Sequence, residues 1–226
     1  MEHFRPVRGL ALAASVLIGL VALAQIGEAA VDWTIYTTVR DYRAGTATIA
    51  DIRDLGPLDT LVGFPLLVLQ GAAAALFITW MYRARVNAER LTYVQEHRRS
   101  RGWVIGAWFV PFANLVLPKQ IADDIWRAND PLQQTVPLQQ RTRHPLVTAW
   151  WGTFVPAVIF GVIYVNYTQN GQLSTGSFLR AAVFSTLSAV LGIAAAVLGV
   201  RMVRRITAMQ SCPGSPATSE GPAPAA

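Results

Sequence analysis

The chain has 226 residues, of which 53% are hydrophobic and 14% are charged, and its net charge is +6. A soluble domain carries about 25% charged residues, so this composition excludes a soluble enzyme with an ordinary charged surface. It also excludes a disordered chain, which would be poor in apolar residues. One cysteine, Cys212, is too few for a disulfide scaffold or a cysteine-based zinc site. We expect an all-α, polytopic integral membrane protein without metal or cofactor.

Four apolar segments are long enough to cross a bilayer, which takes about 20 helical residues. They lie at residues 9–30, 61–82, 146–167 and 177–200. We therefore predict four transmembrane helices, and the domain boundaries follow from them. The predicted parts are a first helix with a short N-terminus (1–30), an extracytoplasmic loop (31–60), a membrane domain with three helices (61–210), and a disordered tail rich in Pro, Ala, Gly and Ser (211–226).

The positions of Arg and Lys predict the orientation, because these residues accumulate on the cytoplasmic side. Most of them lie in residues 1–8, 83–145 and 201–226, whereas residues 31–60 hold more Asp than Arg and residues 168–176 hold no charge. We expect a protein of the cell membrane whose two termini and middle region are cytoplasmic. Because the cations flank apolar segments, we expect contact with the bilayer and no nucleic-acid partner.

The first segment has an alternative interpretation as a signal peptide. Arg5 and Arg8 precede its apolar run, and Ala22-Leu23-Ala24 has the small-residue pattern of a cleavage site. Removal of residues 1–24 would leave the orientation of the other three helices unchanged. The sequence leaves both alternatives open.

The cytoplasmic region 83–145 opens with basic residues. Residues 83–91 contain no helix breaker, so the second helix should continue into the cytoplasm. Arg98, Arg99 and Arg101 follow, and each could contribute about 1 kcal/mol to contact with anionic lipid. The alternative is that these cations only specify topology.

Residues 103–118 carry no charge although they lie in this basic region. A helix of about 15 residues reaches roughly 22 Å, short of the roughly 30 Å hydrocarbon core, and Pro111 interrupts it further. We expect a re-entrant or interfacial segment in the cytoplasmic leaflet, with Trp103 and Trp108 at the interface. The side chain of Asn114 would satisfy backbone groups freed by the prolines or, alternatively, bind a ligand.

A short amphipathic helix follows this segment. Its apolar face consists of Ile121, Ala122, Ile125 and Trp126. Asp123 and Arg127 are spaced as an i, i+4 ion pair. Asp124 diverges from Asp123 by about 100° around a helix, so we expect both carboxylates on a solvated face at the membrane surface.

Eleven residues in this order and spacing resemble a bacterial, mostly actinobacterial, membrane-protein family known as domain of unknown function 4328, over about residues 60–205. They are Trp80, Arg83, Asn87, Trp103, Trp108, Pro111, Asn114, Pro118, Trp126, Trp150 and Trp151. The resemblance implies structural roles for the Trp and Pro residues. It implies a fold and a topology but no activity.

No catalytic motif is present, so we expect a non-enzymatic scaffold or partner-binding protein. Its binding face would combine residues 103–118 with the apolar face of residues 121–126. A separate hypothesis is an enzyme that uses Asp123 or Asp124 on a lipid-borne substrate.

The alternative to a scaffold is transport or binding of a small molecule or lipid. Its cavity would lie beside residues 103–118, because short broken apolar segments mark transporter sites. Arg83, Asn87 and Asn114 would supply the polar contacts.

Overall fold

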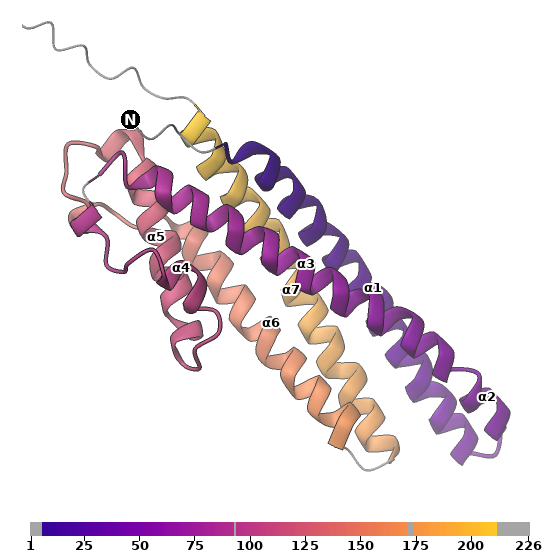
Figure 1. Cartoon of the computed structure of the whole chain (residues 1–226). Helices are drawn as coiled ribbons and strands as arrows, with labels where there is room; N and C mark the ends of the chain where they lie inside the picture. The colour runs from indigo at the N-terminus through magenta and orange to yellow at the C-terminus, as the bar shows by residue number, and fades with distance from the viewer. Residues whose placement is uncertain (1–5, 93, 171–173, 212–226) are drawn as a thin grey trace, which may run out of the picture.

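The computed structural model describes residues 6–92, 94–170 and 174–211, and this part of the chain is helical without a β-strand (Figure 1). Four helices are long and apolar enough to cross a membrane. They are α1 (Arg8–Arg43), α3 (Gly56–Ala88), α6 (Pro145–Asn170) and α7 (Thr175–Ser211). The predicted all-α polytopic fold is therefore confirmed. The predicted tail lies outside the described residues except for Ser211, which ends α7.

The predicted loop over residues 31–60 is mostly helical. Helix α1 continues to Arg43 because residues 31–43 contain neither Gly nor Pro, and it ends just before Gly45, whose φ is +80°. The short helix α2 (Ile49–Arg53) follows, with Thr48 and Asp51 forming a capping box at its start. Only a short turn therefore separates α1 from α2, and α3 begins directly afterwards.

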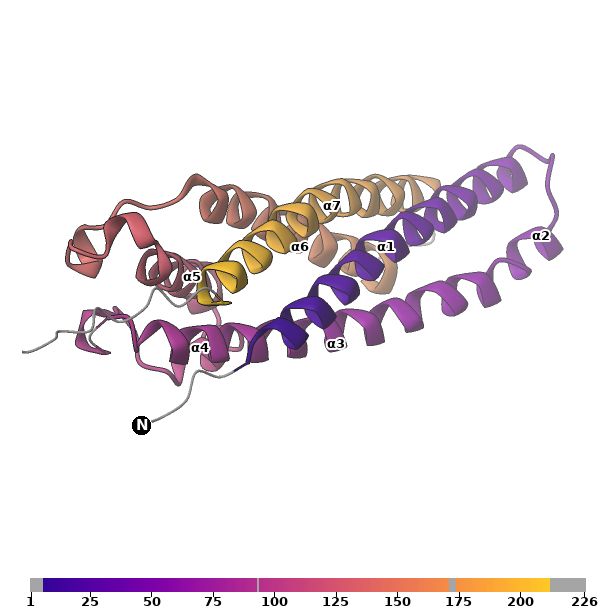
Figure 2. The same cartoon turned by 90° about the horizontal axis from the view of Figure 1, so that it is seen from above.

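The four long helices pack in the order α3, α1, α7, α6 (Figure 2). Helix α1 contacts both α3 and α7, whereas α6 packs against α7 alone along most of its length. Small residues make the close contacts, as expected where helix backbones approach in lipid. They include Ala11, Ala14, Ser15, Ala22 and Ala29 on α1, and Ala181, Ala182, Ser185, Ser188 and Ala189 on α7.

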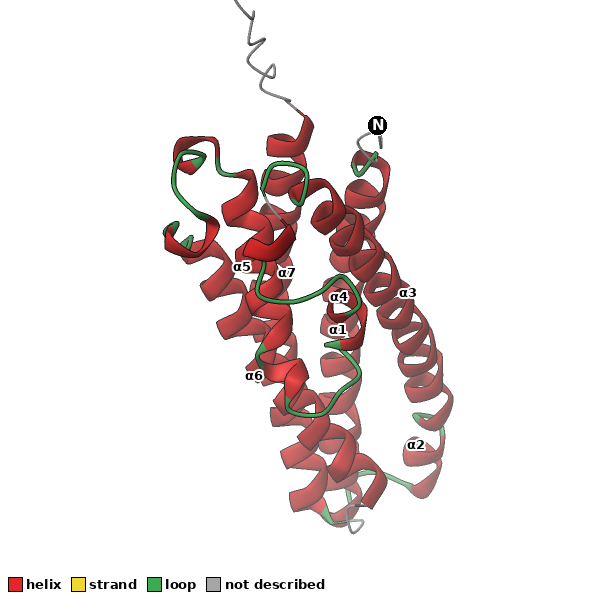
Figure 3. Cartoon of the chain, turned by 60° about the vertical axis from the view of Figure 1, so that its left-hand side comes forward, coloured by secondary structure: helices red, strands yellow, loops and turns green. Residues whose placement is uncertain are grey.

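Residues 89–144, which we call the cap, join α3 to α6 at one end of the bundle. The cap contains α4 (Trp103–Gly106), α5 (Leu117–Asn129) and four 3-10 turns, η1 (Val94–Glu96), η2 (Ala113–Leu115), η3 (Pro131–Gln133) and η4 (Leu138–Gln140). Both termini of the described chain lie at this end (Figure 1). Helices α4 and α5 lie between α3 and α6, which otherwise make little contact (Figure 3).

Helix α5 does not lie on a surface, as its amphipathic pattern had suggested. Its residues are buried except Lys119 and Gln120, which are partly exposed, and the apolar face from Ile121 to Trp126 is at most 4% exposed. That face packs into the main core together with Trp80, Met81, Trp150, Met202 and Ile206. The core is therefore concentrated where α5 enters the bundle.

Candidate functional site

Residues 103–116 form a helical hairpin, which we call the hairpin. It starts at α4, turns through Pro111 and returns through η2 to α5, running along the side of the bundle toward its middle (Figures 1 and 3). The side chains at its turn are exposed: Phe109 by 72%, Val110 by 42% and Phe112 by 84%. The hairpin thus presents an apolar tip outside the protein core.

Aromatic side chains hold the base of the hairpin. The Trp108 ring packs edge-on against Phe77 of α3, with ring centroids 5.9 Å apart, and against Trp151 and Phe154 of α6. The Trp151 indole N–H donates a hydrogen bond to the Leu115 carbonyl at 2.9 Å. These contacts fix both arms of the hairpin and leave its tip free.

The tip contains a strained residue. Phe112 has φ +62° and ψ −38°, and it is the one non-glycine residue of the described chain with positive φ. A side chain in such a sparsely populated backbone region costs about 1–3 kcal/mol. Because strain of this kind clusters at functional sites, it marks the hairpin tip as a candidate for function.

The cap encloses buried charges that the sequence had assigned to a solvated face. Asp124 is 1% exposed and accepts hydrogen bonds from Arg98, whose Nη2 lies 2.7 Å from Oδ1. Asp123 is 2% exposed and its Oδ2 lies 3.0 Å from Lys119 Nζ. The prediction of solvated aspartates was therefore wrong, as was the pairing of Asp123 with Arg127.

The basic run at residues 98–101 is partly neutralised. Arg98 is paired with Asp124, while Arg101 pairs with Glu89, which also accepts from Arg85 at 3.0 Å. Two of the three cations predicted to contact anionic lipid therefore have acidic protein partners. Glu89, Asp123 and Asp124 each face a cation, an arrangement typical of buried structural pairs.

His97 completes this polar layer as a neutral group. Its Nε2 lies 2.9 Å from Thr92 Oγ1 and its side chain is nearly buried. Burial, together with the positive charges of Arg85 and Arg141, lowers the pKa of His97 to about 3. His97 therefore stays uncharged near neutral pH.

The three residues predicted as ligand contacts lie in different surroundings. Asn87, fully buried, donates from Nδ2 to Gln210 Oε1 at 3.3 Å, and Gln210 in turn donates to the Ala84 carbonyl. Arg83 donates to the Pro6 carbonyl at 3.2 Å. Asn114 lies in the returning arm of the hairpin, where its backbone N–H donates to the Val110 carbonyl.

Most of the tryptophans of the sequence motif are buried in the core. Trp80 donates to Thr207 Oγ1 at 3.1 Å, and the Trp126 ring stacks on His144 at 4.2 Å. Trp150 lies so close to α7 that a Cβ on Gly199 would be 3.0 Å from its Nε1. Trp103, which is 37% exposed, differs from the others because it starts α4 at the surface.

Pro118 and Pro111 have different local roles. Pro118 lies in the first turn of α5, where its missing N–H leaves no intrahelical bond unmade. Pro111 is exposed at the turn of the hairpin, and its carbonyl accepts from the Ala113 N–H at 2.7 Å.

Asp32 is a polar residue that sequence reasoning missed. It was assigned to a loop, but it lies within α1, is 6% exposed and accepts a hydrogen bond from the Tyr164 hydroxyl of α6 at 3.2 Å. The absence of helix breakers after residue 30 was the signal that could have placed it in the helix.

Residues 43–208 match the family model described as domain of unknown function 4328. This agrees with the resemblance over residues 60–205 and extends it to the end of α1. Searches of curated proteins and of solved structures gave no match. Since the family model covers well over half of the chain, the protein belongs to the DUF4328 family.

Proposed function

We propose that the protein resides in the bacterial cell membrane with the cap and both termini on the cytoplasmic side. Cations support this orientation: Arg143, Arg201, Arg204 and Arg205 lie at the cap end of the bundle. The opposite end, around α2, balances its arginines with Asp41, Asp51 and Asp54. The positive-inside rule then assigns the cap to the cytoplasm.

In this orientation the hairpin is a re-entrant element of the cytoplasmic leaflet. Its tip is apolar and exposed, and its backbone is hydrogen-bonded within the hairpin, for example from Asn114 N–H to Val110 O at 3.0 Å. Non-helical backbone at membrane depth needs such internal partners.

The function we propose is non-enzymatic binding of another integral membrane protein through the hairpin tip. One observation carries this proposal: Phe112 is the most exposed aromatic residue of the tip and has a strained backbone, whereas the nearby Trp108 packs against Phe77 of α3. An apolar segment of a partner within the bilayer is the ligand that fits such a surface. The apolar face of α5, which the sequence predicted as part of the binding surface, is buried and therefore unavailable to a partner.

The ion pairs of the cap support a structural rather than a catalytic role for Asp123 and Asp124. The side chain of Asn87 is fully buried and donates to Gln210, which argues against its use in the alternative ligand cavity. Binding through the hairpin therefore has stronger support than a cavity formed by Arg83, Asn87 and Asn114.

The proposal is tested by photo-crosslinking in intact cells of the native host. A photoreactive phenylalanine analogue at Phe112 or Phe109 should form a discrete adduct with an integral membrane protein, identified by mass spectrometry. The same analogue at Phe64 of α3, 66% exposed but remote from the cap, is the matched control. Phe64 should yield lipid adducts alone.

Single-cysteine labelling on a Cys212→Ser background provides the control for orientation. A cysteine at Thr135 in the cap should react with an impermeant thiol reagent after membrane permeabilisation, whereas a cysteine at Thr46 should react in intact cells.

Lipid adducts alone at Phe109 and Phe112 would contradict partner binding. Labelling of the Thr135→Cys variant in intact cells would contradict the orientation.

A further inference from the structure

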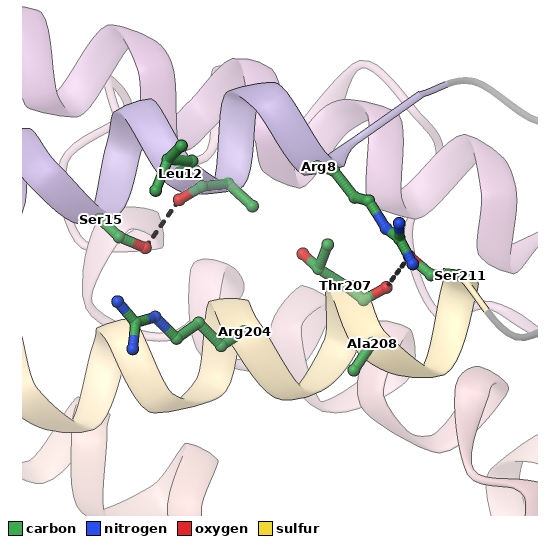
Figure 4. A pocket seen from close by; sticks show the side chains of 8 residues that line it. Arg8, Leu12, Ser15, Arg204, Thr207, Ala208 and Ser211 are labelled. Carbon is green, nitrogen blue, oxygen red and sulfur yellow. Dashed lines mark hydrogen bonds between the residues drawn. The ribbon is translucent and has the colours of Figure 1, made fainter.

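The first turns of α1 and the last turns of α7 enclose an open groove of about 340 Å³ at the cap end of the bundle (Figure 4). Arg8 of α1 lies at one end of the groove beside Ser211, and Arg204 of α7 points toward the other end near Ser15, with Thr207 between them (Figure 4). The groove is remote from the hairpin, so it does not depend on the proposed partner binding.

Both cations of the groove are available to a ligand. No ion pair joins Arg8 or Arg204 to an acidic residue within the described part of the chain. Arg8 uses its Nε to donate to Ser211 Oγ at 2.9 Å, which positions the guanidinium at the groove and leaves its terminal nitrogens free to bind an anion. Arg98 and Arg101, by contrast, are neutralised by Asp124 and Glu89.

Apart from the hydroxyl groups of Ser15, Thr207 and Ser211, the groove lining between the cations is apolar. Ala11 and Ala208 line it with small side chains, and Leu12 is 63% exposed beside it. The hydroxyl of Ser15 is already bound to the Ala11 carbonyl, so this part of the groove offers little to a polar ligand. A ligand that matches the groove therefore combines an anionic group for the two cations with a hydrocarbon chain for the exposed apolar surface at Leu12.

We propose that this groove binds one anionic phospholipid. The anionic headgroup lies in the groove, where Arg8 and Arg204 attract it from opposite ends, and an acyl chain follows Leu12 along the surface of α1 toward the membrane centre. Both cations lie at the ends of their apolar segments, where lipid phosphates are found, which gives the charge complementarity for this occupant. A membrane headgroup supplies the phosphate, rather than a soluble phosphate ester, because the groove opens between two membrane-spanning helices.

Native mass spectrometry of the detergent-solubilised full-length chain, titrated with phosphatidylglycerol and with phosphatidylcholine, tests this proposal. The wild type should retain one phosphatidylglycerol at least tenfold more tightly than phosphatidylcholine. The double variant Arg8→Gln/Arg204→Gln should weaken phosphatidylglycerol binding about tenfold or more, since each cation near a lipid surface contributes about 1 kcal/mol.

The double variant Arg201→Gln/Arg205→Gln is the matched control, because it removes two exposed α7 cations that do not line the groove. It should change affinity less than twofold. Ala208→Phe fills the groove without changing charge and should also weaken binding, which keeps the test valid if the arginine variant fails to fold.

Three results would overturn the proposal. Equal losses in the two double variants would show attraction to surface charge alone. Displacement of the lipid by millimolar inorganic phosphate would show a simple anion site. Unchanged binding in Ala208→Phe would place the lipid outside the groove.

Discussion

Asp124 is a buried carboxylate whose charge is matched by one arginine from a distant part of the chain. It accepts hydrogen bonds from the Arg98 backbone N–H at 3.2 Å and from two guanidinium nitrogens. Loss of one partner of a buried ion pair lowers the free energy of unfolding by about 3–5 kcal/mol. We expect Asp124→Asn to lower it by about 2–3 kcal/mol, because Arg98 is 22% exposed to solvent. Unfolding in mixed micelles with added sodium dodecyl sulfate measures this change.

The exposed pair of Arg40 and Asp41, with side chains 54% and 42% exposed, supplies the control. Asp41→Asn should leave the free energy of unfolding almost unchanged, because solvent screens an exposed pair. Equal effects of the two substitutions would show that burial does not set the strength of these pairs.

The environment of individual charges was the least predictable part of the chain. Asp123 has a cation four residues away in each direction, Lys119 and Arg127, so spacing alone could not select the true partner. The partner of Asp124 lies 26 residues earlier, and such a pairing depends on tertiary packing. Composition correctly indicated few charges but not that the cap buries several of them.

The hairpin has a shape that its sequence did not specify. Its apolar, Pro-containing sequence predicted a segment that neither crosses the bilayer nor behaves as a soluble loop, and that inference required only length and charge. The tertiary contacts were not predictable, because Trp108 contacts Phe77 and Trp151 of two other helices.

Helix α5 was predicted as a helix from its periodicity, yet its polar face is covered by cap residues far from it in sequence.

Strain in the hairpin can be measured by comparing two glycine substitutions. Phe112→Gly removes the positive-φ conflict and should raise the free energy of unfolding by about 1 kcal/mol. Phe109→Gly removes a similarly exposed ring without positive φ and should lower it by about 0.5–1 kcal/mol. Mixed-micelle unfolding gives both values. If the two variants were equally stable, the backbone at Phe112 would carry no strain.

The order of the helices across the molecule gives α1 a central place. The family match begins at residue 43, so nearly all of α1 lies outside the matched region. Nevertheless α1 packs between α3 and α7, and its N-cap residue Val7 and first-turn residue Ala11 belong to the main core. Hydropathy predicted that four helices exist, but it carried no information on which helices are neighbours, since all four are apolar around most of their surfaces.

This arrangement predicts that the chain can be divided at the turn after α1. Fragments 1–44 and 45–226, expressed together, should associate and co-purify because α1 fits between two helices of the larger fragment. Ala14→Leu in the small fragment should abolish association, since Ala14 is fully buried in a small-residue contact. Ala30→Leu, on the exposed face of α1, adds the same volume and should have no effect. Association that survives Ala14→Leu would show that α1 is held by lipid-driven proximity rather than by packing, and the order α3, α1, α7, α6 would then not be required for a stable fold.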